Sequence, residues 1–215
     1  VGNDPMKWQL LAKTEEFGIN LEITPSKPLV LQGNQGLSQK GKEPGNASYY
    51  YSFTRMIASG EVTTPQGTFD VTGLSWLDRE WSTSVLESNQ VGWDWFALQL
   101  NDGTDLMYYQ LRDREGKPDK QSSGKLVNPN GESRNLNFEE VALQVVKFWK
   151  SPKSGASYPA GCTLKLASEN LDLEISPRMS DQELQTTVSY WEGSVRVQGT
   201  QNGQPIQGVG YVEMT

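Results

Sequence analysis

Apolar and polar residues alternate along most of this chain, which is the pattern of half-buried β-strands. Residues 7–13 and 18–24 alternate in this way and predict a hairpin, which ends at Pro25 because proline cannot donate a ladder hydrogen bond. Turn residues recur about every ten positions, and no long amphipathic helix is apparent. Further strands are predicted at 29–31, 49–62, 68–81, 92–100, 106–113, 123–127, 141–149, 162–167, 171–175, 190–198 and 208–214.

One of these segments, 141–149, is apolar enough to be a buried strand, although residues 138–148 could form a short helix instead. Its valines and aromatic residues are strong β-formers and therefore favour a strand. The whole pattern predicts an all-β fold, a sandwich or a barrel.

The two ends of the chain carry similar patterns, at 8–25 and at 163–177. Each contains a pair of alternating segments that closes on a proline, and each is followed by an aromatic strand and by a strand with glycine at its start. Self-similarity of this kind predicts two copies of one architecture. We assign residues 1–88 to a first domain and 89–215 to a second. The second copy has additional strands between Trp93 and Trp149, so we expect the first domain to be truncated, with its opening strands upstream of Val1.

Four of the chain's seven tryptophans lie in the segment 73–113, which we interpret as three strands. Successive side chains of a strand point to opposite faces, so alternate residues share a face. The first strand then presents Trp76, Asp78 and Glu80 on one face and Leu77, Arg79 and Trp81 on the other. The second strand presents Trp93, Trp95, Ala97 and Gln99 together. Aromatic walls with a few charges are typical of a pocket for an apolar or amphipathic ligand. The alternative is an ordinary aromatic β core.

Charge and composition exclude several classes of function. The chain has 26 acidic and 19 basic residues, a net charge of −7, and its basic residues are scattered, which argues against nucleic acid or an anionic membrane as a partner. The chain has no histidine, which excludes histidine-containing triads and most zinc and non-haem iron sites. The single cysteine, Cys162, excludes an intrachain disulfide or a thiolate cluster. We therefore expect no metal and no cofactor.

Three motifs connect the chain with a known family. They are Tyr-Tyr-Ser-Phe-Thr-Arg at 50–55, Gly-Leu-Ser-Trp-Leu-Asp-Arg-Glu-Trp at 73–81, and Gly-Trp-Asp-Trp-Phe-Ala at 92–97, the last followed by Asp102-Gly103 and by Tyr-Gln-Leu-Arg at 109–112. With them the chain resembles the lipocalin-like family that joins AttH-type bacterial proteins with carotenoid 1,2-hydratase (hydroxyneurosporene synthase). The resemblance covers most of the chain.

This resemblance implies two β-barrel-like domains in tandem, with a ligand cavity near their junction. It also implies a partner in the cell envelope or in export machinery, because AttH-type members are often considered partners of membrane export systems. A periplasmic or envelope-associated location is therefore expected, with a cytoplasmic location as the alternative. The oligomeric state does not follow from the sequence.

The hydratases of this family carry the motif Asp-His-Glu-Trp, whose His and Trp act with a downstream Tyr and Asp on an isoprenoid double bond. Here Arg79 stands at the His position, and arginine keeps its proton near neutral pH. Trp81 matches the Trp, Tyr108 matches the Tyr, and Gln110 falls at the acid position, although a gap would move that position to Asp113. These departures argue against hydratase chemistry of that kind.

Three functions remain for this aromatic site. The first is a carrier of an apolar or isoprenoid-like molecule, in which Arg79, Asp78 and Glu80 anchor the ligand and the wall includes Trp76, Trp81, Trp93, Trp95, Tyr108 and Gln110. The second is a cofactor-free lyase, isomerase or cyclase acting on a polyene or terpenoid, with Asp78, Glu80 and Tyr108 as candidate catalytic groups. For either carboxylate alone, a salt bridge to Arg79 or Arg55 is the alternative. The third is a carbohydrate-binding module whose aromatic rings stack on sugars.

Overall fold

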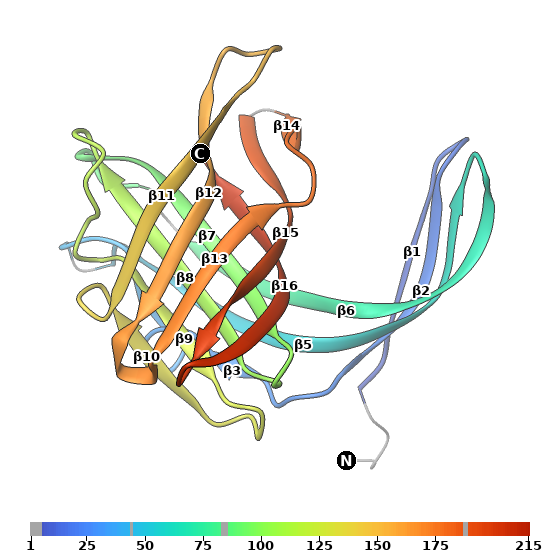
Figure 1. Ribbon diagram of the computed structural model, residues 1–215, viewed down its shortest axis with the longest axis horizontal. Helices are drawn as coiled ribbons and strands as arrows, with labels where there is room; N and C mark the ends of the chain where they lie inside the picture. The colour runs from blue at the N-terminus through green and yellow to red at the C-terminus, as the bar shows by residue number, and fades with distance from the viewer. Residues whose placement is uncertain (1–5, 44, 83–85, 187–188) are drawn as a thin grey trace.

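The computed structural model describes residues 6–43, 45–82, 86–186 and 189–215, and nearly all of them lie in or between antiparallel strands (Figure 1). The predicted all-β fold is confirmed, and residues 141–149 form a strand. The helical element in the described ranges is a single 3-10 turn, η1 (Ala167–Glu169). Three short strands were not predicted: β4 (Leu37–Gln39), β10 (Ser133–Asn137) and β14 (Glu183–Gln185).

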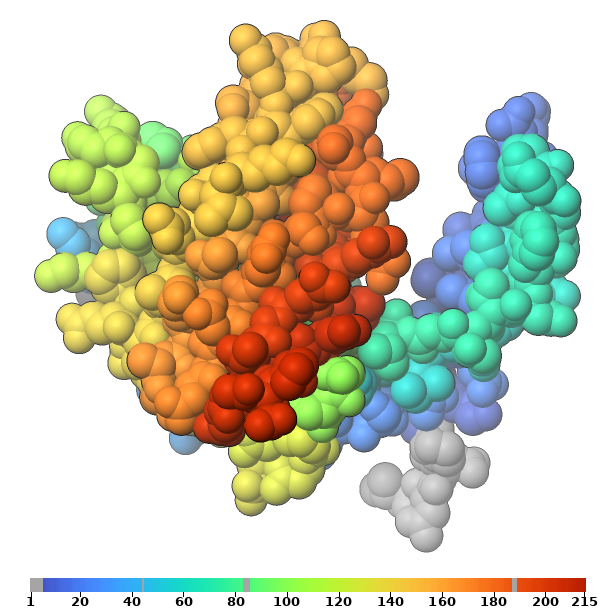
Figure 2. Space-filling view, in the orientation of Figure 1, coloured from blue at the N-terminus to red at the C-terminus, as the bar shows by residue number. Residues whose placement is uncertain are grey.

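The first sheet is a curled half-barrel built by residues 8–82. Its strands are β1 (Trp8–Lys13), β2 (Gly18–Pro25), β3 (Val30–Leu31), β4, β5 (Ala47–Thr64) and β6 (Gly67–Ser82). The long β5–β6 hairpin starts beside the second sheet and curls away from it together with β1 and β2 (Figure 1). A hollow separates the tip of this hairpin from the second sheet (Figure 2). The core of the first sheet is small, with Ile23, Phe53, Met56 and Ala58 buried.

The second sheet is built by residues 90–214 and holds the main core. In spatial order it contains β10, β9 (Ser123–Val127), β8 (Asp105–Asp113), β7 (Gln90–Leu100), β16 (Gln204–Met214), β15 (Ser189–Gln201), β13 (Leu171–Pro177), β12 (Ser157–Leu166) and β11 (Val141–Lys150), with β14 paired to β15. The even-numbered residues of β7 and β8 face this core, where Phe96, Leu98, Leu106 and Tyr108 are fully buried. The odd-numbered residues of the same strands therefore face outward, toward the first sheet.

The two sheets repeat one strand order. The run β1-β2-β5-β6 of the first sheet recurs as β12-β13-β15-β16 in the second. Glycine occupies the same place in both copies because the neighbouring strand comes too close for a side chain. A Cβ on Gly60 would lie 2.1 Å from the carbonyl oxygen of Asn20, and one on Gly199 would lie 2.0 Å from that of Asp172. The repeat seen in the sequence is therefore a repeat of strand pairing and of close backbone approach.

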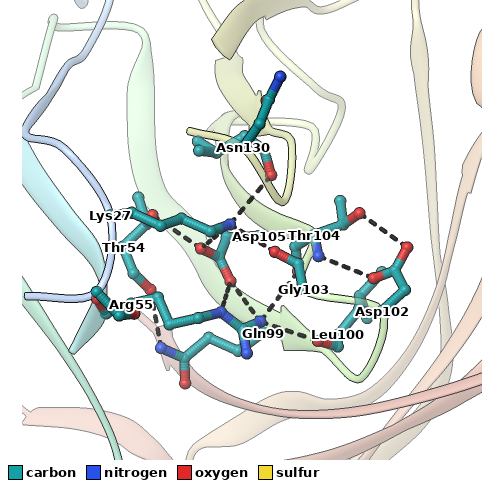
Figure 3. A network of polar contacts seen from close by, with 12 residues as sticks. Lys27, Thr54, Arg55, Gln99, Leu100, Asp102, Gly103, Thr104, Asp105 and Asn130 are labelled. Carbon is teal, nitrogen blue, oxygen red and sulfur yellow. Dashed lines mark hydrogen bonds and ion pairs between the residues drawn. The ribbon is translucent and has the colours of Figure 1, made fainter. Parts of the chain in front are cut away.

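A buried ion network ties the sheets together at the β7–β8 turn (Figure 3). Asp105, at the start of β8, accepts from Lys27 Nζ at 2.7 Å, from Arg55 Nη2 at 2.7 Å and from Thr54 Oγ1 at 2.9 Å. Arg55 also donates to the carbonyl oxygen of Leu100 at 2.9 Å. Arg55 is thus engaged here, and the alternative that it pairs with Asp78 or Glu80 is wrong.

Candidate functional site

A cavity of about 1130 Å³ lies where the two sheets face each other. The first sheet contributes side chains from β5 and β6, and the second contributes side chains from β7, β8 and β16. Seven aromatic residues from both sheets line the cavity: Tyr50, Trp76 and Trp81 from the first sheet, and Trp93, Trp95, Tyr109 and Tyr211 from the second.

Strand alternation explains why these side chains meet. Trp76, Asp78 and Glu80 share one face of β6, and Trp93, Trp95, Ala97 and Gln99 share the outward face of β7, as the alternation in the sequence predicted. The indole nitrogen Nε1 of Trp95 donates to Tyr50 Oη at 3.1 Å, so the two walls are joined by a hydrogen bond. The rings of Trp76 and Trp95 also meet edge to face, with centroids 6.4 Å apart.

Asp78 is the most enclosed carboxyl group of the first wall. It accepts hydrogen bonds from Tyr50 Oη at 2.6 Å, Ser52 Oγ at 2.5 Å and Trp76 Nε1 at 2.7 Å, all of them neutral donors. Burial raises the pKa of this carboxyl group, and the three hydrogen bonds offset part of the rise. Asp78 is therefore a carboxyl group held in place at the cavity wall without a cationic partner among the described residues.

Glu80 lies two residues further along the same face and has a cationic partner. Lys40 Nζ is 3.0 Å from Glu80 Oε1, and Ser48 Oγ donates to the same oxygen at 2.5 Å. The Lys40 ammonium group also lies 3.6 Å from the ring centroid of Tyr109, close enough for a cation–π interaction. The anticipated salt bridge from Glu80 to Arg79 or Arg55 is replaced by this pair with Lys40.

Glu213 supplies a third carboxyl group from the opposite wall, on β16. Trp93 Nε1 donates to Glu213 Oε1 at 2.6 Å. Burial raises the pKa of Glu213, and the nearby carboxylates Glu192, Glu80 and Asp78 raise it further. The cavity thus has acidic groups on both walls, set among aromatic rings.

Sequence reasoning missed Lys40, Tyr109 and Glu213. Lys40 comes from the segment 32–46, whose Gly, Asn, Gln, Lys and Ser residues are typical of a loop. Glu213 comes from the last strand, far along the sequence from the tryptophan motifs. The alternation of Val209, Tyr211 and Glu213 on one face of β16 was the available signal for the last of these.

Three predicted site residues do not reach the cavity. Arg79 lies on the opposite face of β6, opposite Tyr51, and is exposed. Tyr108 points into the core of the second sheet, where its hydroxyl group has no hydrogen-bond partner in the described structure. Gln110 is buried on the same inner face, opposite Asp94 of β7. The reason is the same for each: the neighbouring residue of the strand faces the cavity instead, as Tyr109 does on β8.

Trp81 has an intermediate position. It contributes to the cavity lining, but its ring lies against Tyr49 and Tyr51, with centroid distances of 5.8 Å and 6.3 Å. Its side chain is 53% exposed, so much of the ring remains open to a ligand or to solvent.

The described part of the chain offers no group of three or more acidic, cysteine or histidine side chains placed to hold a metal ion. It also has no helix long and apolar enough to cross a membrane.

Comparison with known proteins gives consistent results. The family described as AttH-like matches residues 2–215 of the chain. Kievitone hydratase of Fusarium solani subsp. phaseoli is 21% identical over 210 residues, which are 94% of this chain and 58% of that protein.

Two solved structures share the fold. A protein assigned as AttH from Nitrosomonas europaea superposes with a TM-score of 0.87 at 36% identity, covering 97% of this chain and 64% of that one. Kievitone hydratase from Nectria haematococca superposes with a TM-score of 0.79 at 19% identity, with the same coverage, 97% and 64%. The chain therefore spans less than two thirds of the length of each of these proteins. The similarity confirms the lipocalin-like β fold.

Proposed function

The chain belongs to the AttH-like family, and we propose that it binds an apolar or isoprenoid-like small molecule in the cavity between its two sheets. Family membership and the similarity to kievitone hydratase support a hydratase-like or binding role in general. The observation that carries the finer proposal is the cavity itself, about 1130 Å³ in volume and lined by four tryptophans. Pockets for drug-sized ligands measure about 300–1,000 Å³, so this one has room for a molecule of that size.

An apolar ligand would gain mainly from leaving water. Each buried methylene group contributes about 0.8 kcal/mol, so a ten-carbon chain contributes about 8 kcal/mol before the cost of association, which is about 4 kcal/mol or more. The indole N–H groups of the aromatic wall are already paired with other wall residues, as in the contact of Trp95 with Tyr50 and of Trp93 with Glu213. An apolar chain can therefore cover the rings without breaking a hydrogen bond.

Tryptophan fluorescence and calorimetric titration test this proposal. Terpenoid alcohols, fatty alcohols and oligosaccharides would be titrated into the wild type, Trp93→Ala and Trp149→Ala. Trp149 is the matched control, because it lies on β11, outside the cavity, and stacks on Tyr158. Saturable binding of the alcohols that weakens in Trp93→Ala and not in Trp149→Ala is expected. Binding of oligosaccharides alone would instead support a carbohydrate-binding module.

Cofactor-free hydration of an isoprenoid double bond is the second candidate, and Asp78 favours it. A carboxyl group with a raised pKa can give its proton to an alkene carbon, leaving a carbocation that the surrounding aromatic rings stabilise. Water then adds to the cation, and a carboxylate such as Glu213 accepts the proton that the water releases. Glu213 then releases its proton to solvent and Asp78 takes one up, so the net reaction adds one water molecule to the double bond.

Product analysis separates the two candidates. Chromatography of the ligand recovered after long incubation would show either the intact molecule or an alcohol heavier by one water. If the protein is a hydratase, Asp78→Asn should abolish the product while the affinity for the substrate stays within a few-fold of wild type. Recovery of only intact ligand from the wild type would exclude the hydratase and leave binding as the remaining function.

A further inference from the structure

We propose that Arg178 binds an anionic head group, a carboxylate or a phosphate, of the ligand whose apolar part fills the cavity. This inference rests on the proposed binding function and adds the class of ligand: an amphiphile with an oxyanion at one end.

Arg178 lines the cavity from the second sheet. It follows directly on β13, and its backbone N–H donates to the carbonyl oxygen of Ser194 on β15 at 3.0 Å. Ser194 lines the cavity as well and lies opposite Tyr211 of β16. The arginine is therefore fixed by its backbone to the strand that forms this end of the cavity.

The guanidinium group of Arg178 is unpaired in the described structure. No carboxylate of the described residues forms an ion pair with it, and no hydrogen bond there uses its side chain. The other cation of the cavity, Lys40, is paired with Glu80. Arg178 is itself exposed while it lines the cavity, so its donors lie on the solvent side of the cavity, where a polar head group can stay hydrated. A planar guanidinium with five N–H donors matches the two oxygens of a carboxylate or phosphate.

The two cations of the cavity are separated along its length. Lys40, with its partner Glu80, lies at the end formed by the first sheet and β8, whereas Arg178 lies beside β15. Glu213 lies between them, on β16. Between β8 and β15 the strand order runs β8-β7-β16-β15, which is three steps of about 4.8 Å or roughly 14 Å in total. The rings of Trp93 and Trp95 and the side chain of Val209 occupy that interval.

This separation sets the orientation of the ligand. Lys40 is already paired with Glu80, and the carboxyl groups Asp78 and Glu213 offer no positive charge to an anionic head group, whereas the unpaired guanidinium of Arg178 would attract it. The head group therefore belongs at Arg178, and the apolar tail extends between the tryptophans toward Asp78. If the protein is a hydratase, this orientation brings the far end of the tail to the acid.

Isothermal titration calorimetry with ten-carbon probes tests the inference. Decanoate, decyl phosphate, decan-1-ol and decyltrimethylammonium would be titrated, below their micelle concentrations, into the wild type, Arg178→Met and Arg196→Met. Arg196 is the matched control, because it lies on β15, is exposed and is outside the cavity lining, and its replacement changes the net charge equally. Circular dichroism would check that each variant is folded.

We expect decanoate or decyl phosphate to bind more tightly than decan-1-ol, with the preference identifying which oxyanion the site takes. In Arg178→Met the affinity for that oxyanion should fall about tenfold or more, since a charge-assisted bidentate contact is lost. Binding of decan-1-ol should stay within about twofold, because its chain still occupies the tryptophan wall. Arg196→Met should behave as wild type toward all four probes.

Other results would overturn the inference. If decan-1-ol binds but neither oxyanion binds more tightly, or if Arg178→Met keeps the preference, the binding function stands and the role of Arg178 is wrong. If decyltrimethylammonium binds most tightly, the carboxylates Asp78 and Glu213 dominate the cavity and the ligand is a cation. If none of the probes binds, the binding function itself fails and the inference fails with it.

Discussion

Removing the charge of Asp105 should cost this protein a large part of its stability. The Asp105 side chain is fully buried, and its partners Lys27 and Arg55 are only 4% and 15% exposed. Asp105→Asn keeps the shape of the side chain but leaves two largely desolvated cations without a counter-charge (Figure 3). Breaking a buried ion pair by removal of one partner costs about 3–5 kcal/mol. Because domains are stable by about 5–15 kcal/mol in total, this loss is roughly a third to a half of a mid-range value of about 10 kcal/mol.

Urea unfolding followed by tryptophan fluorescence at pH 7 measures this loss directly. Asp172→Asn is the control, because its pair with Lys165 has side chains that are 49% and 57% exposed and should contribute at most about 1 kcal/mol. A double variant, Lys27→Met with Asp105→Asn, should recover part of the loss, since one of the two uncompensated cations is gone.

A midpoint for Asp105→Asn close to that of Asp172→Asn would refute the reasoning. It would mean that the network remains hydrated in solution and that its burial between the sheets contributes little. An unchanged loss in the double variant would locate the penalty at Arg55 rather than at Lys27.

Three further predictions concern the core and the strand packing. Burial raises the pKa of Asp94 from 3.8 to about 6, despite Arg112 nearby. The stability tied to its protonated form is complete below about pH 4 and is lost as the pH rises through 6, so the free energy of unfolding relative to Asp94→Asn should fall by about 3 kcal/mol over that window. Parallel pH profiles of stability for the two proteins would contradict this. Tyr108→Phe removes a buried hydroxyl group without a hydrogen-bond partner in the described structure. In urea unfolding it should raise the stability by about 1 kcal/mol, and it should leave ligand affinity unchanged. A loss of affinity would show that Tyr108 contacts the ligand. Gly199→Ala should cost about 1–3 kcal/mol, because its Cβ would lie 2.0 Å from the Asp172 carbonyl oxygen, while Gly73→Ala, with nothing within 4 Å, should be neutral.

Strand alternation made the faces of the site predictable, because a period of two depends only on local geometry. It correctly separated Trp76, Asp78 and Glu80 from Arg79, and it grouped Trp93 with Trp95. It could not decide which face of a strand meets the other sheet. In β8 the adjacent tyrosines 108 and 109 must point to opposite sides, and only the packing of the sheets shows that Tyr109 is the one in the cavity.

Residues from distant segments were beyond the reach of local patterns. Lys40 enters the site because the segment before β5 folds back along it, with Lys40 N–H donating to the carbonyl oxygen of Asn46 at 2.9 Å. Glu213 enters because β16 pairs with β7, which places it opposite Trp95. Neither pairing has a signature in the few residues that form it. The folded structure was therefore needed to identify Glu213 on the second wall and Lys40 as the partner of Glu80.

The hydratase motif is divided between the two faces of β6, and this division decides which chemistry the cavity can support. Arg79, at the position of the motif histidine, lies on the face away from the cavity, whereas Asp78 and Glu80 lie within it. A proton donor for the proposed hydratase reaction would therefore come from the residues that line the cavity, and not from position 79. Asp78 is the better suited of the two in β6, because Glu80 is neutralised by Lys40, while Asp78 is held by neutral donors and has a raised pKa. The same arrangement serves a pure binding protein equally well, since a carboxyl group that is fully hydrogen-bonded to its own wall leaves the tryptophan rings free to contact an apolar ligand.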